Sequence, residues 1–292
     1  MMLRIEHLNY TYNPQTAYEK QALKDIDFEI GEREFIGIIG HTGSGKSTLI
    51  QHLNGLLKAS SGSIFFRGTN IYANDFDLRT LRQKVGLVFQ YPEYQLFESD
   101  VLSDVCFGPK NKGLSKEESA NKAIWALRAV GMDEKYDNAS PFELSGGQKR
   151  RVAIAGILAM EPDVLILDEP TAGLDPKGRD DILSLIDRLH KEKGITVILV
   201  SHSMEEIAKY VDRIIVLNEG EILYDAAPKE VFSHYRRLEE VGLCAPAVTY
   251  ILNALKEKGL RVDTSAGSVF EAAKAIADAL KTRMEGGDTP TC

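Results

Sequence analysis

A glycine-rich segment near the amino end has the residue types and spacing of a phosphate-binding loop. It reads Gly40-His41-Thr42-Gly43-Ser44-Gly45-Lys46-Ser47, matches the pattern GxxxxGK[ST] and continues through Thr48 into an apolar helical pattern. In such a loop the glycines let successive backbone N–H groups point at phosphate oxygens, and the helix that follows adds favourable potential. The lysine reaches the β- and γ-phosphates, and the hydroxyl is a Mg²⁺ ligand. We therefore expect residues 40–48, called the P-loop below, to bind a nucleotide, with Ser47 on Mg²⁺.

Two adjacent carboxylates follow an apolar run farther along the chain. The run Val164–Asp168 has the composition of a buried strand, and Glu169 comes directly after it. The carboxyl ends of parallel strands lie at the edge of the sheet where a phosphate loop also lies. We expect Asp168 to hold Mg²⁺, directly or through water, and Glu169 to polarise the water that attacks the nucleotide.

A second glycine-containing segment has the features of an anion-binding helix start. Leu144 precedes Ser145-Gly146-Gly147-Gln148, called the signature segment below, and a helical pattern runs from Lys149 to about Met160. A serine cap and free N–H groups at a helix start attract a phosphate. Because one nucleotide does not need two such ends from one chain, we expect the signature segment to cover a nucleotide held by another copy or a related subunit.

The elements that must position these residues alternate in type along the chain. Apolar runs bounded by turns alternate with helical patterns, which is typical of a parallel sheet with crossover helices. The expected fold is α/β, a P-loop NTPase core with an antiparallel β subdomain at the amino end and a closing hairpin. The expected parallel strands are Phe35–Gly40, Val85–Gln90, Val164–Asp168 and Thr196–Ser201; the expected antiparallel strands are Leu3–Tyr12, Asp27–Ile30 and Ser63–Phe66, and the hairpin is Arg213–Leu217 with Ile222–Tyr224.

Two regions have helical patterns outside this core. Residues 91–160 form a helical insert, in which Ser115 and Glu118 have the spacing of a capping box. Apolar positions recur at helical spacing in Pro246–Lys258 and Ser268–Arg283. We expect an ATP-binding-type domain over 1–235, a carboxyl-terminal helical dimerisation module over 236–285 and a flexible tail over 286–292.

Composition limits the kinds of partner. The 292-residue chain is 43% apolar and has a formal net charge of −8, which argues against a nucleic-acid partner. Its three cysteines lack metal-ligand spacing, which fits a reducing compartment. No apolar run is long enough to span a bilayer. We expect a cytosolic chain whose membrane contacts are made through a protein partner.

The combined motifs resemble the ATP-binding-cassette (ABC) ATPases over about residues 1–230. The resemblance rests on the P-loop, on Leu144–Gln148 and on Val164–Asp168 with Glu169. It implies ATP as the nucleotide and a dimer with two shared sites, both competent. It also assigns further residues, in chain order: Tyr12 stacks on adenine, Gln90 contacts Mg²⁺ and the attacking water, Asp175 couples the two sites, and His202 contacts the γ-phosphate.

A narrower resemblance is to the ATPases of energy-coupling factor (ECF) importers. It rests on Phe89–Phe97, His52–Leu57 and the helical tail, and Lys149-Arg150-Arg151 with His41-Thr42 resemble the second, A′-type subunit. The resemblance implies a peripheral protein on the cytoplasmic face of the membrane that energises uptake of vitamins or transition-metal ions. Its partners would be a second ATPase, identical or not, a transmembrane scaffold protein and a substrate-binding membrane subunit.

The segment after Gln90 is the expected docking site for the scaffold. It combines the carboxylates of Glu93, Glu98, Asp100 and Asp104 with Tyr91, Tyr94, Leu96 and Phe97. Such a mixture suits an amphipathic helix with basic residues. Two other readings remain open: the ATPase of another ABC importer class, and a soluble ABC ATPase without a transport role, although no long inserts or basic surfaces support the second.

Overall fold

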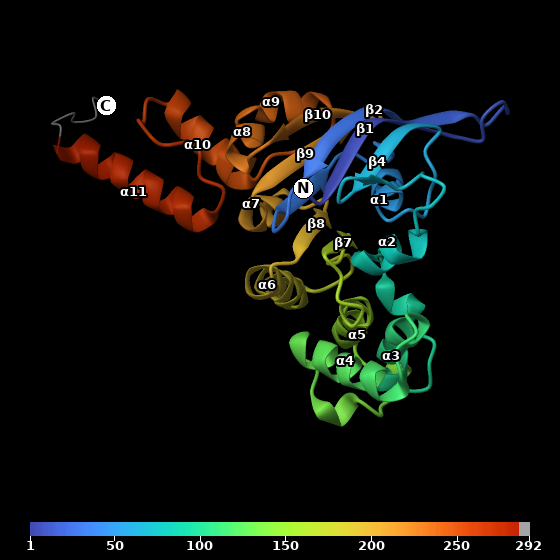
Figure 1. Cartoon of the computed structure of the whole chain (residues 1–292). Coiled ribbons are helices and arrows are strands. Elements are labelled where there is room, and N and C mark those ends of the chain that lie inside the picture. The colour runs from blue at the N-terminus through green and yellow to red at the C-terminus, as the bar shows by residue number, and fades with distance from the viewer. Residues whose placement is uncertain (286–292) are drawn as a thin grey trace.

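Six strands form the central sheet, in the order β10-β9-β3-β8-β7-β6 (Figure 1). The computed structural model describes residues 1–285. Strands β9, β3, β8, β7 and β6 are parallel, and β10 closes the edge antiparallel to β9. Every residue of β3, β7 and β8 is buried, because helices or a second sheet cover both faces. The bounds are β3 Phe35–Ile39, β6 Val85–Val88, β7 Val164–Asp168, β8 Thr196–Val200, β9 Arg213–Asn218 and β10 Glu221–Ala226.

A four-stranded antiparallel sheet lies beside the central one, in the order β2-β1-β4-β5. Its strands are β1 Leu3–Tyr12, β2 Lys20–Ile30, β4 Ser61–Phe66 and β5 Thr69–Asn70. Side chains from this sheet, such as Ile5 and Ile64, share one core with Ile36 and Ile38 of β3. The strand expected at Asp27–Ile30 begins earlier, at Lys20, because β2 pairs along almost the whole length of β1.

The helical insert forms a separate lobe below the sheets in Figure 1. It contains α3 Val101–Asn111, α4 Lys116–Ala129 and α5 Gly146–Leu158, together with short 3₁₀ turns at Pro92–Gln95, Glu134–Tyr136 and Pro141–Glu143. Ser115 and Glu118 form the expected capping box at the start of α4. Buried residues of these helices, including Leu127 and Val152, join the same core as β7 and β8. The lobe is therefore packed on the sheet that carries the site.

Five helices flank the central sheet. They are α1 Lys46–Leu53, α2 Leu78–Lys84, α6 Pro176–Lys193, α7 Met204–Tyr210 and α8 Pro228–Ser233. Helix α1 begins within the P-loop, at Lys46, and α6 and α7 follow β7 and β8. Because the strands β3, β7 and β8 are parallel, they all end at the same edge of the sheet. The loops that follow them therefore lie together.

The carboxyl-terminal part divides between two cores. Helix α9, Tyr235–Glu240, contributes Leu238 to the main core, which also contains Leu243 and Ala245. Helices α10, Ala247–Glu257, and α11, Val269–Glu285, pack on each other around a small apolar cluster of their own. Figure 1 shows this pair extending from the side of the molecule that carries α7. The flexible tail expected over 286–292 lies outside the described residues.

The expected fold class is confirmed, with small differences at element ends. The parallel strand expected to end at Gln90 ends at Val88, so Gln90 lies in an exposed bend two residues beyond it. Helix α5 begins at Gly146 rather than Lys149, because Ser145 caps it. Among residues 1–285, no helix combines the length and the apolar character needed to span a membrane.

Candidate nucleotide-binding and hydrolytic site

The P-loop connects β3 to α1 in a curled conformation. Gly45 has φ 109°, and a Cβ there would lie 2.7 Å from the carbonyl oxygen of Ala22, so only glycine fits. The Lys46 ammonium donates to the carbonyl oxygens of Gly40 at 2.7 Å and His41 at 3.1 Å. Burial lowers the pKa of Lys46, while the nearby Glu169 and Asp168 raise it. This buried cation, which donates to carbonyl oxygens of its own loop, is well suited to receive a phosphate.

The remaining P-loop residues lie where the pattern predicts them. His41 is half-buried, and its Nδ1 lies 2.9 Å from the carbonyl oxygen of Thr42. Thr42 and Gly43 are exposed, whereas Ser44 is fully buried and its hydroxyl has no hydrogen-bond partner. This orphaned hydroxyl and the exposed loop backbone fit a loop that closes around an anion.

Tyr12 lies beside the start of α1. Its hydroxyl is 3.1 Å from the Thr48 hydroxyl, and its ring packs edge-to-face on Tyr10. Tyr12 borders a hollow of about 140 Å³ together with Lys20, Ala22, Gly43, Gly45, Lys46, Ser47 and Thr48. Lys20 and Ala22 were not predicted as site residues, because no pattern marked the first half of β2 as a strand that reaches the P-loop.

Ser47 and Asp168 form an oxygen-rich pair. The Ser47 hydroxyl donates to Asp168 Oδ2 at 3.3 Å, although the two residues are far apart in sequence. Burial, and secondly the charge of Glu169, raise the pKa of the Asp168 carboxyl. A divalent cation would stabilise the charged form of Asp168, and hydroxyl and carboxylate oxygens are suitable Mg²⁺ ligands. The pair therefore fits the expected metal.

Glu169 lies at the centre of a polar group formed by three loops. Gln90 Nε2 donates to one of its carboxylate oxygens at 2.9 Å, and His202 Nε2 lies 2.8 Å from the other. The Glu169 backbone has φ 49°, a left-handed conformation that non-glycine residues seldom adopt. Such strain is typical of functional sites, where surrounding contacts maintain it. The three residues expected to carry the hydrolytic chemistry thus lie together.

Side chains on both sides fix the segment that follows Glu169. The buried Glu206 of α7 accepts hydrogen bonds from Thr171 at 3.1 Å and from Ser201 at 2.7 Å. From the helical lobe, Arg150 donates to the carbonyl oxygens of Pro170 and Ala172. Glu206 was not predicted as a site residue, because a carboxylate in the first turn of a short helix has no distinctive pattern.

The signature segment and Asp175 lie at exposed helix starts. Ser145 and Gln148 form a reciprocal capping box at the start of α5, with Ser145 and Gly146 exposed. Within residues 1–285, no hydrogen bond or ion pair connects the signature segment to the P-loop. Asp175 caps α6 by accepting from the Gly178 N–H at 2.7 Å. The structure therefore does not bring these residues to the chain's own P-loop.

Comparisons with known proteins agree with this arrangement. The family model described as ABC transporter matches residues 23–172. The Energy-coupling factor transporter ATP-binding protein EcfA2 of Clostridium perfringens is 54% identical over 282 residues, covering 96% of this chain and 99% of that protein. Its counterpart in Clostridium tetani is 54% identical over 277 residues, covering 94% of this chain and 96% of that protein.

Two solved structures have the same fold. That of cbiO1 from Clostridium perfringens, part of the ABC transporter complex cbiONQ, has a TM-score of 0.73 at 42% identity and covers 86% of this chain and 98% of its own. The dimeric post-hydrolysis state of the cassette MJ0796, bound to ADP and Pi, has a TM-score of 0.69 at 33% identity, covering 78% and 99%. The chain is therefore an ATP-hydrolysing transport ATPase that belongs to the ABC transporter family and, within it, to the energy-coupling factor transporter ATP-binding proteins.

Proposed function

We propose that this chain hydrolyses Mg²⁺·ATP at a site shared with a second ATPase subunit, and so drives uptake of a vitamin or transition-metal ion through membrane partners. One observation carries the proposal. Glu169 is held between Gln90 and His202 beside the P-loop, whereas within residues 1–285 the signature segment makes no hydrogen bond or ion pair with that loop. This supports a hydrolytic half-site in this chain and leaves the second helix start for a partner's nucleotide.

The chemistry follows from where charge develops. Lys46 neutralises the β- and γ-phosphates, and Ser47 and Asp168 hold Mg²⁺ with Gln90 nearby. Glu169 accepts the proton of the attacking water, since one of its oxygens turns toward that water when Gln90 or His202 moves to the nucleotide. His202 then donates to the γ-phosphate, and the ring of Tyr12 stacks on adenine.

Changing Glu169 to Gln should cut hydrolysis and preserve binding. Glu169→Gln keeps the shape and the hydrogen bonds but removes the base, so we expect ATP turnover to fall by about 10²–10⁴ while ATP affinity stays near wild type. The contrasting variant is Lys46→Ala, which removes a ground-state phosphate contact and should weaken ATP binding itself. Turnover and nucleotide affinity are measured on the same preparations. Normal turnover in Glu169→Gln would refute its role as the base.

A shared site requires the signature segment to act across a dimer. A Cβ added at Gly146 or Gly147 would meet no heavy atom within 4 Å, so the start of α5 is open. Its free N–H groups and the helix dipole favour an anion. The related cassette MJ0796 is dimeric in its ADP- and Pi-bound state, which supports the same arrangement here.

Complementation between variants tests the shared site. Gly147→Asp adds a negative charge that suits a helix start but repels a phosphate, so it should leave the fold intact and stop hydrolysis. Lys46→Ala alone should also be inactive. An equal mixture should regain about a quarter of wild-type turnover, because half of the pairs would be mixed and each would have one intact site. If the natural partner is a different ATPase, the two changes are put in the two subunits. No recovery in any mixture would contradict the shared site.

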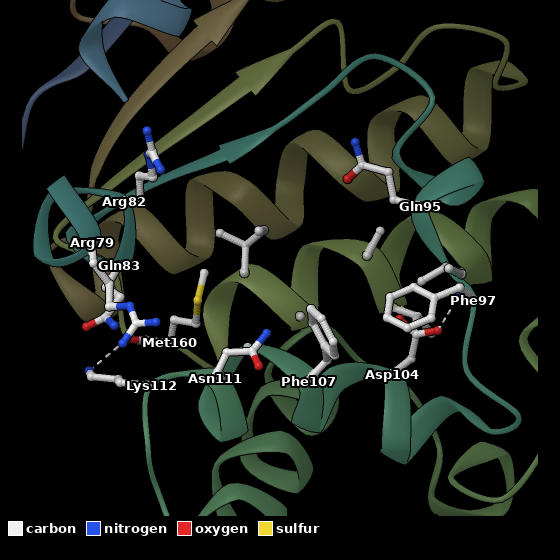
Figure 2. A pocket seen from close by; sticks show the side chains of 16 residues that line it. Arg79, Arg82, Gln83, Gln95, Phe97, Asp104, Phe107, Asn111, Lys112 and Met160 are labelled. Atoms are coloured by element: carbon white, nitrogen blue, oxygen red, sulfur yellow. Dashed lines mark hydrogen bonds between the residues drawn. The ribbon is translucent and has the colours of Figure 1, made fainter. Parts of the chain in front are cut away.

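The surface proposed to receive the scaffold protein is a groove of about 670 Å³ between the helical lobe and α2 (Figure 2). Its apolar part includes Leu96, Phe97 and Phe107, and the Phe97 and Phe107 rings pack edge-to-face with centroids 5.0 Å apart. Figure 2 shows Arg79, Arg82 and Lys112 at one end and Asp104 at the other. An apolar groove with opposite charges at its ends suits an amphipathic helix with one polar orientation. The related cbiO1 is part of a transporter complex, cbiONQ.

The acidic residues near this groove have different roles. Glu93 pairs with the buried Arg150, and Asp100 caps α3 by accepting from the Ser103 N–H. Asp104 accepts from the backbone N–H groups of Phe97 and Glu98. The Glu98 carboxylate has no such intrachain partner among the described residues. Both hydrogen bonds to Asp104 end on Oδ2, whereas both carboxylate oxygens of Glu93 and of Asp100 accept hydrogen bonds. We therefore propose that basic side chains of the scaffold bind Glu98 and Oδ1 of Asp104.

Docking is tested by changing the groove without changing a cap. Phe107→Asp and Glu98→Lys should each abolish co-purification with the membrane scaffold and transport, while the isolated chain still binds ATP. Asp100→Lys is a poorer test because loss of a helix cap costs about 1 kcal/mol by itself. Ile124→Asp changes an exposed apolar residue of α4 outside the groove and serves as the control. Normal assembly of both Phe107→Asp, in the groove, and Glu98→Lys, beside it, would remove this surface from the mechanism.

The carboxyl-terminal helices are proposed to extend the contact between ATPase subunits. Leu252 and Val248 of α10 face the small cluster shared with α11. Val269 and Phe270 are 78% and 81% exposed at the start of α11. Two adjacent exposed apolar side chains suit a protein contact. A deletion after Arg237 would not test this, since it removes Leu238, Leu243 and Ala245 from the main core.

A point change is the sharper test of this contact. Phe270→Ser should shift pairing of the ATPase subunits to higher protein concentration and leave thermal unfolding of the isolated chain unchanged, because the ring is exposed. Ile124→Ser, an exposed apolar residue on α4, is the control. Association is measured by sedimentation over a concentration series with ATP present. Unchanged association of Phe270→Ser would show that the module packs only within its own chain.

A further inference from the structure

One arginine in the helical lobe links two segments of the hydrolytic site. Arg150 is 1% exposed and makes five hydrogen bonds. Its Nε and Nη2 donate to the Glu93 carboxylate at 2.8–3.2 Å. Its Nη1 donates to the carbonyl oxygens of Pro170 at 2.7 Å and Ala172 at 2.8 Å. Every contact is therefore directed at one of two short segments.

Both segments adjoin catalytic residues. Glu93 belongs to the turn Pro92–Gln95, which begins two residues after Gln90. Pro170 directly follows Glu169, and the Ala172 N–H donates back to the Glu169 carbonyl oxygen at 3.1 Å. The same guanidinium thus lies between the segment of Gln90 and the segment of Glu169, whose side chains also meet at 2.9 Å.

The arrangement requires arginine rather than lysine. A guanidinium is planar and offers five N–H donors in a fixed fork, so it can bind a carboxylate on one side and two carbonyl oxygens on the other. A lysine ammonium has three donors at a single point and can serve only one of these groups well. Because the site is buried, any group left unpaired would carry its full desolvation penalty.

The Pro170–Ala172 segment has a second support that does not involve Arg150. Thr171 is held by Glu206 of α7, which also binds Ser201 beside His202. Removing Arg150 would therefore loosen one side of the segment and leave the other attached. This predicts a displaced Glu169 rather than an unfolded loop.

We propose that Arg150 is a positioning residue for hydrolysis. It fixes the position of Glu169 through the carbonyl oxygens of Pro170 and Ala172. Because Glu93 orients the guanidinium, the position of Glu169 also depends on Glu93. The inference rests on the proposed role of Glu169 as the base. It connects the turn after Gln90, next to the proposed docking groove, to the catalytic carboxylate through one rigid side chain. The groups that bind the nucleotide, such as Lys46 and Tyr12, have no bond to Arg150.

The first test separates turnover from nucleotide binding. Arg150→Lys in the full chain, with the second ATPase subunit present if wild type requires it, should lower kcat by about 10- to 100-fold, since displacing a catalytic group by an ångström has effects of that size. The KM for ATP should stay within about twofold, because no phosphate or adenine contact is changed. A merely structural role would lower the melting temperature and leave kcat per folded molecule unchanged, and that result would overturn the proposal.

A second variant tests the link to Glu93 and guards against misfolding of the first. Glu93→Gln keeps Arg150 and its carbonyl contacts but removes the charge that orients the fork, so kcat should fall less than in Arg150→Lys, again with little change in KM. The double variant should be no slower than Arg150→Lys alone, because both changes break one connection. If the kcat losses of the two single variants multiplied in the double variant, the two residues would act independently, which would contradict a shared connection.

Two controls make the outcomes distinguishable. Arg151→Lys changes the neighbouring arginine, which donates to the Val130 carbonyl oxygen and touches neither segment, so its kcat should match wild type. Glu169→Gln is assayed in parallel. If Glu169→Gln is active, the proposed base is wrong whatever Arg150 does; if it is inactive and Arg150→Lys turns over at the wild-type rate, only the positioning role is wrong.

Discussion

The parallel register of β3, β8 and β7 is the constraint on which the site depends. Ile38 lies opposite Val200, and Val200 lies opposite Asp168, so the loops that follow all three strands leave the sheet at one level. Because side chains alternate along a strand, a slip of one residue would turn Asp168 to the other face and separate it from Ser47. Because these strands are packed on both faces, such a slip would also misalign the close-packed side chains on each face. The apolar core thereby fixes the polar geometry.

Most of this arrangement was predictable from the sequence, because its signals are local. The P-loop spacing, the apolar run before Asp168 and Glu169, and the strand before His202 each specify a strand end and the chemistry on it. The capping box at Ser115 has the same local character. The fold class followed from the alternation of these elements, and the structure confirms it.

The features that were not predictable depend on contacts between distant segments. The start of β2 at Lys20 is set by pairing with β1, not by its own apolar pattern. Glu93 was expected on a docking surface, yet it pairs with Arg150, which no local rule connects to it. Both residues lie in segments that marked the resemblance to ECF ATPases. In the structure, the Glu93–Arg150 pair connects the turn after Gln90 to the segment after Glu169.

In the proposed mechanism, Glu169 acts as the base beside this chain's P-loop, and the signature segment acts on the nucleotide of a partner subunit. A structure of the full chain with its ATPase partner, carrying Glu169→Gln and bound to Mg²⁺ and ATP, tests this most directly. We predict Ser145 and Gly147 of one subunit against the γ-phosphate of ATP on the partner's P-loop, with the Lys46 ammonium moved from the Gly40 carbonyl oxygen to phosphate. ATP enclosed by one chain, with both signature segments exposed to solvent, would contradict the account.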